Sequence, residues 1–250
     1  MLVTSKAFTA VGIAIIMIAS GLVGYWAAPG ESGESANDES YYQVSTYARL
    51  SAGGYEGMIS IERLLEHGDF GIGTVEGIDG EMMIIDGIAY RAGTDLTPVE
   101  VPAGTMIPFA MLTKFDIQGT YRAVNIDSYT ELREQFYEMT TFNYTVYAIM
   151  IETEFESITI RSVPGQQEPY PPLTDVIADQ TTKVLYHING TLIGFVMPEG
   201  LGDINLAGFH LHFLSEDLLY GGHVLDMEFS VADISVDAMN IITVTYADHL

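Results

Sequence analysis

The sequence predicts an α+β protein built from mixed or antiparallel β-sheets with few helices. Beyond residue 40, most segments either alternate polar with apolar residues or are rich in β-branched and aromatic residues, and both patterns are typical of strands. The regular alternation of strands and helices that marks a parallel α/β sheet is missing from the pattern. Because 48% of the 250 residues are hydrophobic, the chain can bury a full core without disulfides or a structural metal.

The composition excludes several classes of function. The chain has no cysteine, so thiolate metal sites, thiol catalysis and disulfides are ruled out, and any bound metal must rest on nitrogen and oxygen ligands. Its 9 Lys and Arg residues face 34 Asp and Glu residues, which gives a formal net charge of -25. Such a surface repels the phosphates of nucleic acids, because their binding requires clustered basic residues. We therefore expect no nucleic-acid partner.

The first 28 residues are typical of a targeting segment. Lys6 precedes an apolar run over residues 7–28, which at helical rise is long enough to cross about 30 Å of hydrocarbon. We interpret residues 1–28 as a signal peptide or a membrane anchor, the anchor being slightly favoured because the cleavage pattern is poor; a buried core helix is the alternative. Residues 29–40 are small, polar and acidic, as in a flexible linker, and residues 41–250 are the expected folded domain. Since the basic residue lies before the run, the domain should face outward, extracytoplasmic and either secreted or anchored.

Three short helices are expected in the folded domain. The first covers residues 60–66, with the serine at its start as N-cap. Ser128 and Glu131 form a capping-box pattern, which predicts a helix over residues 129–139. A third short helix is expected near Asp175, after a proline-rich break in the strand pattern.

The remaining segments predict strands. Two short runs, residues 81–85 and 89–91, flank Asp86 and Gly87, a dipeptide that strongly favours a hairpin turn. The segment 145–163 is interpreted as two consecutive strands, because its alternation is confined to its second half. Residues 68–74 are expected to form a turn that enters a strand, and further strands are expected over residues 191–197, 208–214, 223–231 and 234–246.

Three histidines are spaced as metal ligands. His210 and His212 are two residues apart, so on a strand they point to one face with Cα atoms about 6.5 Å apart, while the apolar residues beside them pack on the other face. Gly221 and Gly222 permit a sharp return, after which His223 opens the next strand. Three neutral imidazoles leave a coordination position open, as in catalytic zinc sites, although other divalent first-row metals suit them too. The alternative is a set of half-buried polar residues on an edge hairpin.

Several separated motifs resemble the acetolactate decarboxylase family. The resemblance covers roughly residues 42–226, with the motifs in the family's order and at similar separations, and it implies a homodimer. It also marks residues 41–250 as an acetolactate-decarboxylase-like metal-binding domain. The motifs are GDFGIGT (68–74), DGE (79–81), DGIAYR (86–91), PYPPL (169–173), GTLIGF (190–195), GFHLHF (208–213) and GGHVLD (221–226).

The resemblance implies an activity and a set of site residues. The family converts 2-acetolactate, a 2-hydroxy-3-oxo acid, to acetoin and carbon dioxide at a zinc ion held by three histidines, here His210, His212 and His223. Negative charge develops on oxygen as an enediolate forms, and a cation stabilises it. Glu81 matches an acidic residue that orients water or relays a proton, and Thr74 matches a residue lining the site. From the residues alone, the favoured interpretation of Glu81 is a solvated acid in a turn, and the alternative for Thr74 is a plain strand residue.

Two departures from the family pattern leave the function open. The family carries a substrate-contacting arginine in a Tyr-Ala-Ile-Arg context, where this chain has Met150, and its C-terminal tail bears a glutamate beyond the point matching Leu250. Arg161 and Arg91 match other family arginines, and either can supply the missing charge, although Arg161 is equally interpreted as a structural ion-pair partner. The hypotheses are therefore an acetolactate decarboxylase, an exported metal-bound relative that binds a small carboxylate without decarboxylating it, and a metal-dependent hydrolase.

Overall fold

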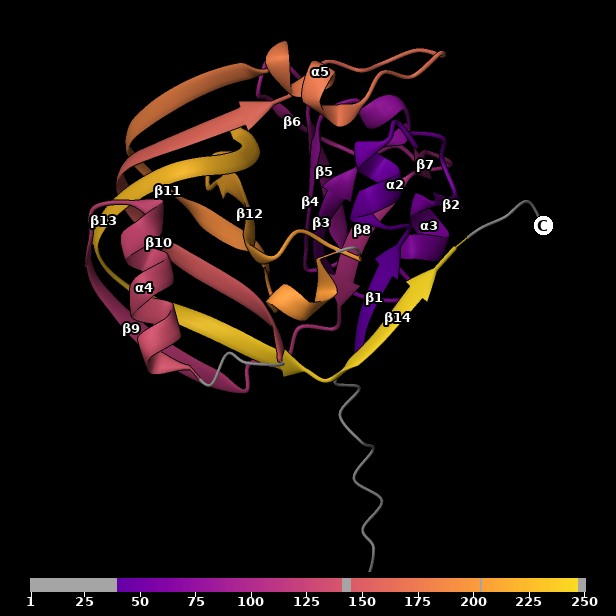
Figure 1. Ribbon diagram of the computed structural model, residues 1–250. Helices are drawn as coiled ribbons and strands as arrows, with labels where there is room; N and C mark the ends of the chain where they lie inside the picture. The colour runs from indigo at the N-terminus through magenta and orange to yellow at the C-terminus, as the bar shows by residue number, and fades with distance from the viewer. Residues whose placement is uncertain (1–39, 141–144, 203, 247–250) are drawn as a thin grey trace, which may run out of the picture. The chain divides into compact units, whose positions relative to one another are not determined.

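The computed structural model describes residues 40–140, 145–202 and 204–246, which form a mostly β fold with few helices (Figure 1). The sheets are mixed and antiparallel, as the sequence predicts. The predicted targeting segment, residues 1–28, and almost all of the linker lie outside these ranges. Within them, no helix is both long and apolar enough to span a bilayer.

Seven of the described strands form one sheet, in the order β14-β1-β8-β3-β4-β5-β6. All neighbouring pairs are antiparallel except β1 and β14, which are parallel and make this sheet mixed. A short pair, β2 (Ile59–Ser60) with β7 (Met106–Ile107), lies apart from it. The seven strands are β1 Ser40–Val44, β3 Phe70–Thr74, β4 Glu81–Ile85, β5 Ile88–Ala92, β6 Pro98–Glu100, β8 Phe109–Thr113 and β14 Ile241–Thr245.

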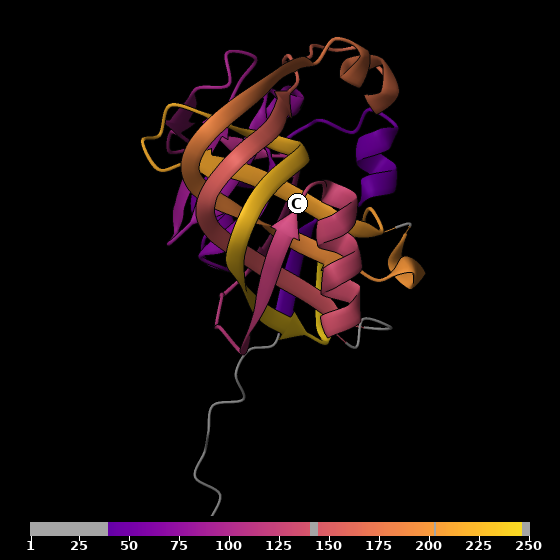
Figure 2. The ribbon, with the colours of Figure 1, turned by 90° about the vertical axis from the view of Figure 1, so that its left-hand side faces the viewer.

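The second large sheet has the order β10-β11-β12-β13-β9, and β10 also pairs with β13. The pairings of β10, β11, β12 and β13 therefore close on themselves, and β9 adds to the other edge of β13. Figure 2 shows the long strands curving side by side. The five strands are β9 Gly119–Ile126, β10 Val146–Ser162, β11 Thr181–Met197, β12 Gly208–Ser215 and β13 Gly221–Met239.

The long strands differ from the sequence prediction. Residues 146–162 form one strand of 17 residues rather than two, since β10 pairs with β11 along one edge and with β13 along the other. The pairing of β10 with β13 shifts register once, between Thr159 and Ile160. In the same way, the segments 223–231 and 234–246 are one 19-residue strand followed by β14.

The helices are short, and the longest follows the prediction. This helix, α4, spans Tyr129–Met139, and the Ser128 side chain accepts a hydrogen bond from the backbone N–H of Glu131, which confirms the predicted cap. Its apolar face, Leu132 and Phe136, is buried against the second sheet. The other helices are α2 Tyr47–Ser51, α3 Ile61–Leu64, α5 Leu173–Ala178 and the 3₁₀ turns η1 Glu76–Ile78 and η2 Glu199–Leu201.

Two apolar clusters set the direction in which β12 presents its side chains. One cluster lies between the two large sheets, where Phe70 and Met111 meet Ile193 and Phe195 of β11. The other lies beneath α4 and includes Phe209 and Phe213. Each fully buried side chain of this size contributes about 1.5–3 kcal/mol, so the first cluster holds the two sheets face to face and the second packs α4 on the five-stranded sheet. One face of β12 is thereby turned toward the seven-stranded sheet.

Candidate metal centre

The three predicted ligands converge where β12 faces the seven-stranded sheet. Phe209, Leu211 and Phe213 are buried in the cluster beneath α4, so His210 and His212 point the opposite way. His223 lies directly across from His212 in the β12–β13 pairing. The ring centroids are 5.2 Å apart for His210 and His212, 5.0 Å for His210 and His223, and 5.4 Å for His212 and His223. The rings therefore surround a common point, as the spacing predicts.

The two glycines before His223 have a different role from the one predicted. They lie within β13, and the chain reverses earlier, over residues 216–219, where Leu218 has a φ of 56°. A Cβ on Gly222 would stand 2.5 Å from the carbonyl oxygen of Arg161 in β10. Glycine at this position lets β13 approach β10 closely, and this approach sets the depth at which His223 enters the site.

The donor atoms fit a divalent metal. One ligand atom from each histidine lies within 4.8 Å of the other two. His210 Nδ1, His212 Nε2 and His223 Nδ1 are buried without a hydrogen-bond partner among the described residues, while His212 Nδ1 donates to the carbonyl oxygen of Met82 at 2.9 Å. An unpartnered buried polar atom costs about 1–3 kcal/mol, and one cation would satisfy all three. These three residues can therefore hold a metal ion.

Burial keeps the histidines in the form that binds metals. Desolvation, with a smaller effect of the nearby Arg161 charge, lowers the pKa of His210 to about 3. Burial likewise holds the pKa of His212 and of His223 well below the usual histidine value. The imidazoles are thus neutral at physiological pH, and each has a lone pair available for a cation.

Glu81 and Arg161 form a buried ion pair beside the histidines. Arg161 lies across from His223 in the β10–β13 pairing, so it points to the same face. Its Nη1 atom is 3.3 Å from Glu81 Oε1, and Glu81 Oε2 is 3.4 Å from His212 Nε2. Burial raises the pKa of Glu81, and the positive charge of Arg161 partly opposes this shift. The pair brings an acid with raised proton affinity and a fixed positive charge to one place.

Thr74 anchors the segment that delivers Glu81. It is the last residue of β3 and its hydroxyl donates to the carbonyl oxygen of Gly80 at 2.7 Å. Gly80 directly precedes Glu81 and has a φ of 94°, a left-handed conformation that favours glycine. The hydrogen bond ties the end of β3 to the start of β4, and so fixes the backbone from which the Glu81 side chain extends.

These residues border a cavity of about 200 Å³ with two unlike sides. The polar side holds the three histidines, Glu81, Arg161 and Thr74. The other lining residues are mostly apolar and come from α2, α5, η1, β3, β8, the segment after β10 and the segment before β12. Sequence reasoning missed these apolar residues, because they are ordinary hydrophobic residues far apart in the chain. They are Leu50, Ile78, Phe109, Val163, Leu173, Ile177 and Leu206, with Tyr47 and Gly73 beside them.

The structure also distinguishes between the candidate cations. Within the described part of the chain, neither Met150 nor Arg91 lines this cavity. Met150 packs against the cluster between the sheets, and Arg91 Nη2 pairs with Asp79 Oδ2 at 2.9 Å. Of the three positions, Arg161 is the one that brings a positive charge to the cavity.

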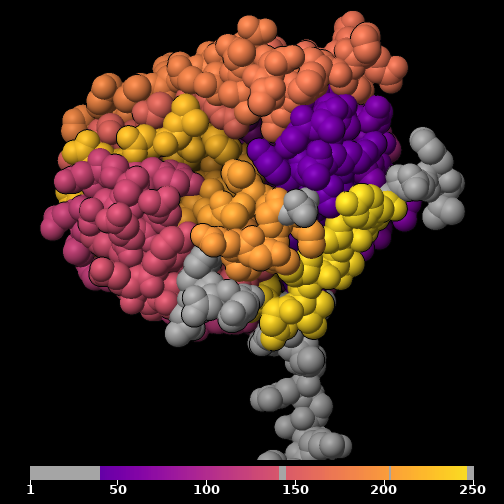
Figure 3. All heavy atoms as spheres, in the orientation of Figure 1, coloured from indigo at the N-terminus to yellow at the C-terminus, as the bar shows by residue number. Residues whose placement is uncertain are grey.

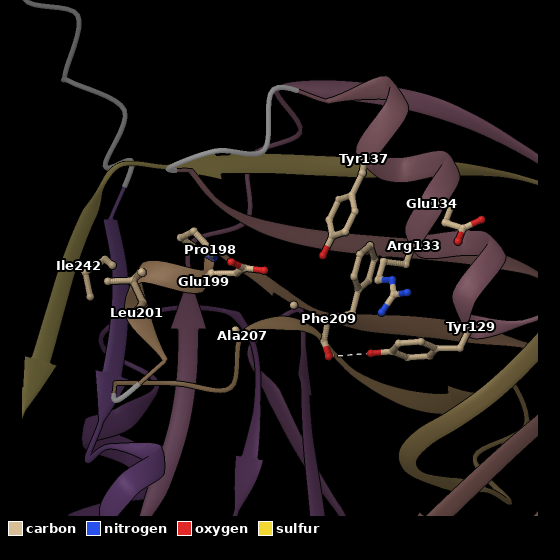
Figure 4. Close-up of a pocket in the computed structure, with 12 residues that line it drawn as sticks. Tyr129, Arg133, Glu134, Tyr137, Pro198, Glu199, Leu201, Ala207, Phe209 and Ile242 are labelled. Atoms are coloured by element: carbon tan, nitrogen blue, oxygen red, sulfur yellow. Dashed lines mark hydrogen bonds between the residues drawn. The ribbon is translucent and has the colours of Figure 1, made fainter.

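A larger cavity, of about 1060 Å³, lies on the other face of β12 (Figure 4). Residues of α4 and η2 border it, and the Tyr129 hydroxyl donates to the carbonyl oxygen of Phe209 at 2.6 Å. None of its described lining residues is a histidine. Phe209 lines this larger cavity, whereas His210, the next residue of β12, lines the smaller one. The three histidines therefore gather at the smaller of the two cavities.

The fold and the site define a mostly β protein with a three-histidine centre suited to a divalent first-row metal. The family model for alpha-acetolactate decarboxylase matches residues 41–249. An alpha-acetolactate decarboxylase of Methanosarcina mazei is 38% identical over 201 residues, which are 80% of this chain and 69% of the relative. One from Brevibacillus brevis is 33% identical over 199 residues, covering 80% and 70%. The chain belongs to the alpha-acetolactate decarboxylase family.

Solved structures agree with this assignment. The alpha-acetolactate decarboxylase of Bacillus subtilis strain 168 superposes with a TM-score of 0.79 at 30% identity, covering 82% of this chain and 88% of that one. A Staphylococcus aureus protein, described as of unknown function and similar to alpha-acetolactate decarboxylase, has the same TM-score and coverage at 32% identity.

Proposed function

We propose that the protein is a metal-dependent decarboxylase that converts 2-acetolactate to acetoin and carbon dioxide. The observation that carries this proposal is the set of three buried, unpartnered imidazole nitrogens beside the Glu81–Arg161 pair at one cavity. Membership of the acetolactate decarboxylase family supports the choice of substrate. Zinc is the proposed ion, since three neutral imidazoles with an open position are typical of catalytic zinc.

The reaction requires stabilisation of negative charge. When carbon dioxide leaves a 3-oxo acid, the electrons of the broken bond move onto the neighbouring oxygen. A divalent ion, when bound by the three histidines, would supply a positive charge that stabilises this oxygen as the charge develops. The apolar side of the cavity excludes water, and charge interactions are stronger where water is excluded.

The chain's own residues bind the substrate and move the proton. Arg161 presents a permanently charged guanidinium with several donors, which suits it to bind and orient the substrate carboxylate. Glu81, whose pKa is raised by burial, holds the proton that is delivered to carbon after carbon dioxide has left. Thr74, through its hydrogen bond to Gly80, keeps Glu81 in place.

The proposal is tested with the purified full-length chain. Acetoin formation from 2-acetolactate is measured after loading with zinc, after removal of metal by a chelator, and after zinc is restored. We expect activity only in the loaded states and its loss in His210→Ala. Metal-loaded protein that binds acetolactate without forming acetoin would refute the proposal in favour of a binding protein, and turnover of esters alone would favour a metal-dependent hydrolase.

Two further features belong to the same proposal. We propose that residues 1–28 direct the domain outside the cytoplasm, as a cleaved signal or an anchor, on the strength of their apolar run. Mass spectrometry of the N-terminus, with fractionation of the producing cells, decides between a cleaved and an anchored form. We also propose a homodimer, which sedimentation of the purified protein tests.

A further inference from the structure

A buried polar cluster lies beneath the segment that leads into β12. Tyr41, Gln43 and Asn205 are all 0% exposed. Asn205 Nδ2 donates to the Tyr41 hydroxyl oxygen at 2.8 Å and to Gln43 Oε1 at 2.9 Å, and it also contacts the Met111 sulfur. The Tyr41 hydroxyl donates in turn to Gln43 Oε1. Burial raises the pKa of Tyr41, so the hydroxyl keeps the proton that it donates.

This cluster holds residues 204–206 by several hydrogen bonds. Gln43 Nε2 donates to the carbonyl oxygen of Ile204 at 2.8 Å, and the backbone N–H of Tyr47 donates to the same oxygen at 2.8 Å. Asn205 Oδ1 accepts from the backbone N–H of Leu206 at 2.7 Å. The segment is therefore fixed to β1 and α2, although it lies between η2 and β12 in the chain.

Leu206 is the residue whose position this arrangement determines. It lines the metal cavity, together with Leu173 and Ile177 of α5, and yet it is 37% exposed. It thus forms part of the wall between the cavity and solvent. In Figures 1 and 3 the segment before β12 lies at the surface, between α4 on one side and the indigo N-terminal elements on the other. His210 follows four residues later.

The energetics of the cluster favour a positioning role over a purely stabilising one. Replacing buried polar groups by apolar groups of similar shape is often neutral for stability, whereas a fully connected polar network fixes one geometry. A leucine that remains 37% exposed gains only part of the free energy of a buried leucine. A connected cluster of this kind is therefore well suited to fixing the position of one segment.

We propose that Asn205 is a positioning residue that holds Leu206 at the mouth of the metal cavity. Leu206 there contacts the alkyl part of the substrate and shields the polar side of the cavity from water, where charge interactions would otherwise be weakened. This inference rests on the proposed decarboxylase function and adds two residues to it.

The first test compares two exposed leucines. Leu206→Ala is expected to raise the KM for acetolactate about tenfold, because part of one leucine's apolar contact is lost. Leu206→Met, which keeps a side chain of similar volume, is expected to have a KM within about twofold of the wild type. Leu219→Ala is the matched control, because Leu219 is 56% exposed and does not line the described cavity. Equal kinetic constants in Leu206→Ala and Leu219→Ala would overturn the proposal.

The second test asks whether Asn205 acts through Leu206. Asn205→Ala should raise KM, and adding Leu206→Ala to it should cause no further loss, because the wall is already displaced. Additive effects on kcat/KM, or a lowered Tm with unchanged KM, would mean that Asn205 only stabilises the fold. If Asn205→Ala does not fold, Gln43→Met removes the side-chain donor to Ile204 and the acceptor of Asn205 and Tyr41, with little change in side-chain length.

A third measurement does not depend on turnover. In metal-free protein, hydrogen exchange at the amides of Tyr47 and Leu206 should be at least about tenfold faster in Asn205→Ala than in wild type, while amides of α4 exchange as before. Unchanged exchange at these two amides would refute the positioning role of Asn205. If the wild-type protein produced no acetoin, the proposed function and the substrate contact of Leu206 would be refuted. The hydrogen-exchange measurement would still test whether Asn205 positions Leu206.

Discussion

Removal of the positive charge at Arg161 should destabilise the folded protein strongly at neutral pH. The Arg161 side chain is 14% exposed and that of Glu81 is 10% exposed, and their atoms are 3.3 Å apart. Breaking a buried pair by removing one partner costs about 3–5 kcal/mol, because the remaining charge is buried and unpaired. For a domain of this size each kcal/mol lowers Tm by about 2–4 °C. Metal-free Arg161→Met should therefore melt at least about 6 °C below wild type at pH 8.

The deficit should shrink in acid, and its sign follows from Glu81. Without Arg161, nothing opposes the effect of burial on the pKa of Glu81, so the folded variant binds a proton more tightly than the unfolded chain. Its stability relative to wild type is thus lowest above the raised pKa and recovers as the pH falls toward the ordinary value of 4.5. Thermal unfolding at pH 8 and pH 5 measures this recovery.

The control is an exposed pair of the same kind. Arg122 and Asp233 are 3.2 Å apart, with 66% and 57% of their side chains exposed, and such surface pairs contribute less than about 1 kcal/mol. Arg122→Met should change Tm little at either pH. Equal losses in the two variants, or a deficit in Arg161→Met that does not depend on pH, would refute the electrostatic reasoning.

Three further predictions concern the metal and the backbone. Zinc at about 100 times its Kd should stabilise the wild-type protein by about 2.7 kcal/mol. A thermal shift assay should show that the same zinc concentration leaves the Tm of His223→Ala at its zinc-free value. Metal-free protein should lose stability as the pH falls from the usual histidine value of 6.5 toward the pKa of His210 at about 3, because the unfolded chain binds the protons. His223→Gln has one such histidine fewer, so its free energy of unfolding, measured in denaturant titrations, should fall by about 1.4 kcal/mol less per pH unit than that of wild type. Gly222→Ala, whose Cβ would stand 2.5 Å from the Arg161 carbonyl oxygen, should unfold several degrees earlier than Gly200→Ala, whose Cβ meets nothing within 4 Å.

The parts of the fold that depend on neighbouring residues were predictable from the sequence. The cap of α4 is set by Ser128 and Glu131, three residues apart. The hairpin of β4 and β5 is set by Asp86 and Gly87, both of which have positive φ values. The common face of His210 and His212 follows from the period of a strand. In each case the signal lies within a few residues.

The rest of the site depends on contacts between distant segments. Glu81 reaches His212 across 131 positions of the sequence and from the other sheet, and no local pattern indicates that approach; only family resemblance singled it out. The glycines before His223 were interpreted as a turn because a missing Cβ serves a turn and a close strand approach equally well. Met150 lies in one row with Ile193 and His212 across β10, β11 and β12. It therefore shares the face of the histidines, although it does not line the described cavity.

The row formed by His212, His223 and Arg161 has a consequence for folding. The three residues lie side by side on β12, β13 and β10, so sliding β13 by one residue would turn His223 to the opposite face of the sheet. A cation that requires all three imidazoles would bind only chains in which β10, β11, β12 and β13 are paired in the native register. The ion would then act as a check on assembly, favouring correctly aligned molecules over misaligned ones by its full binding free energy.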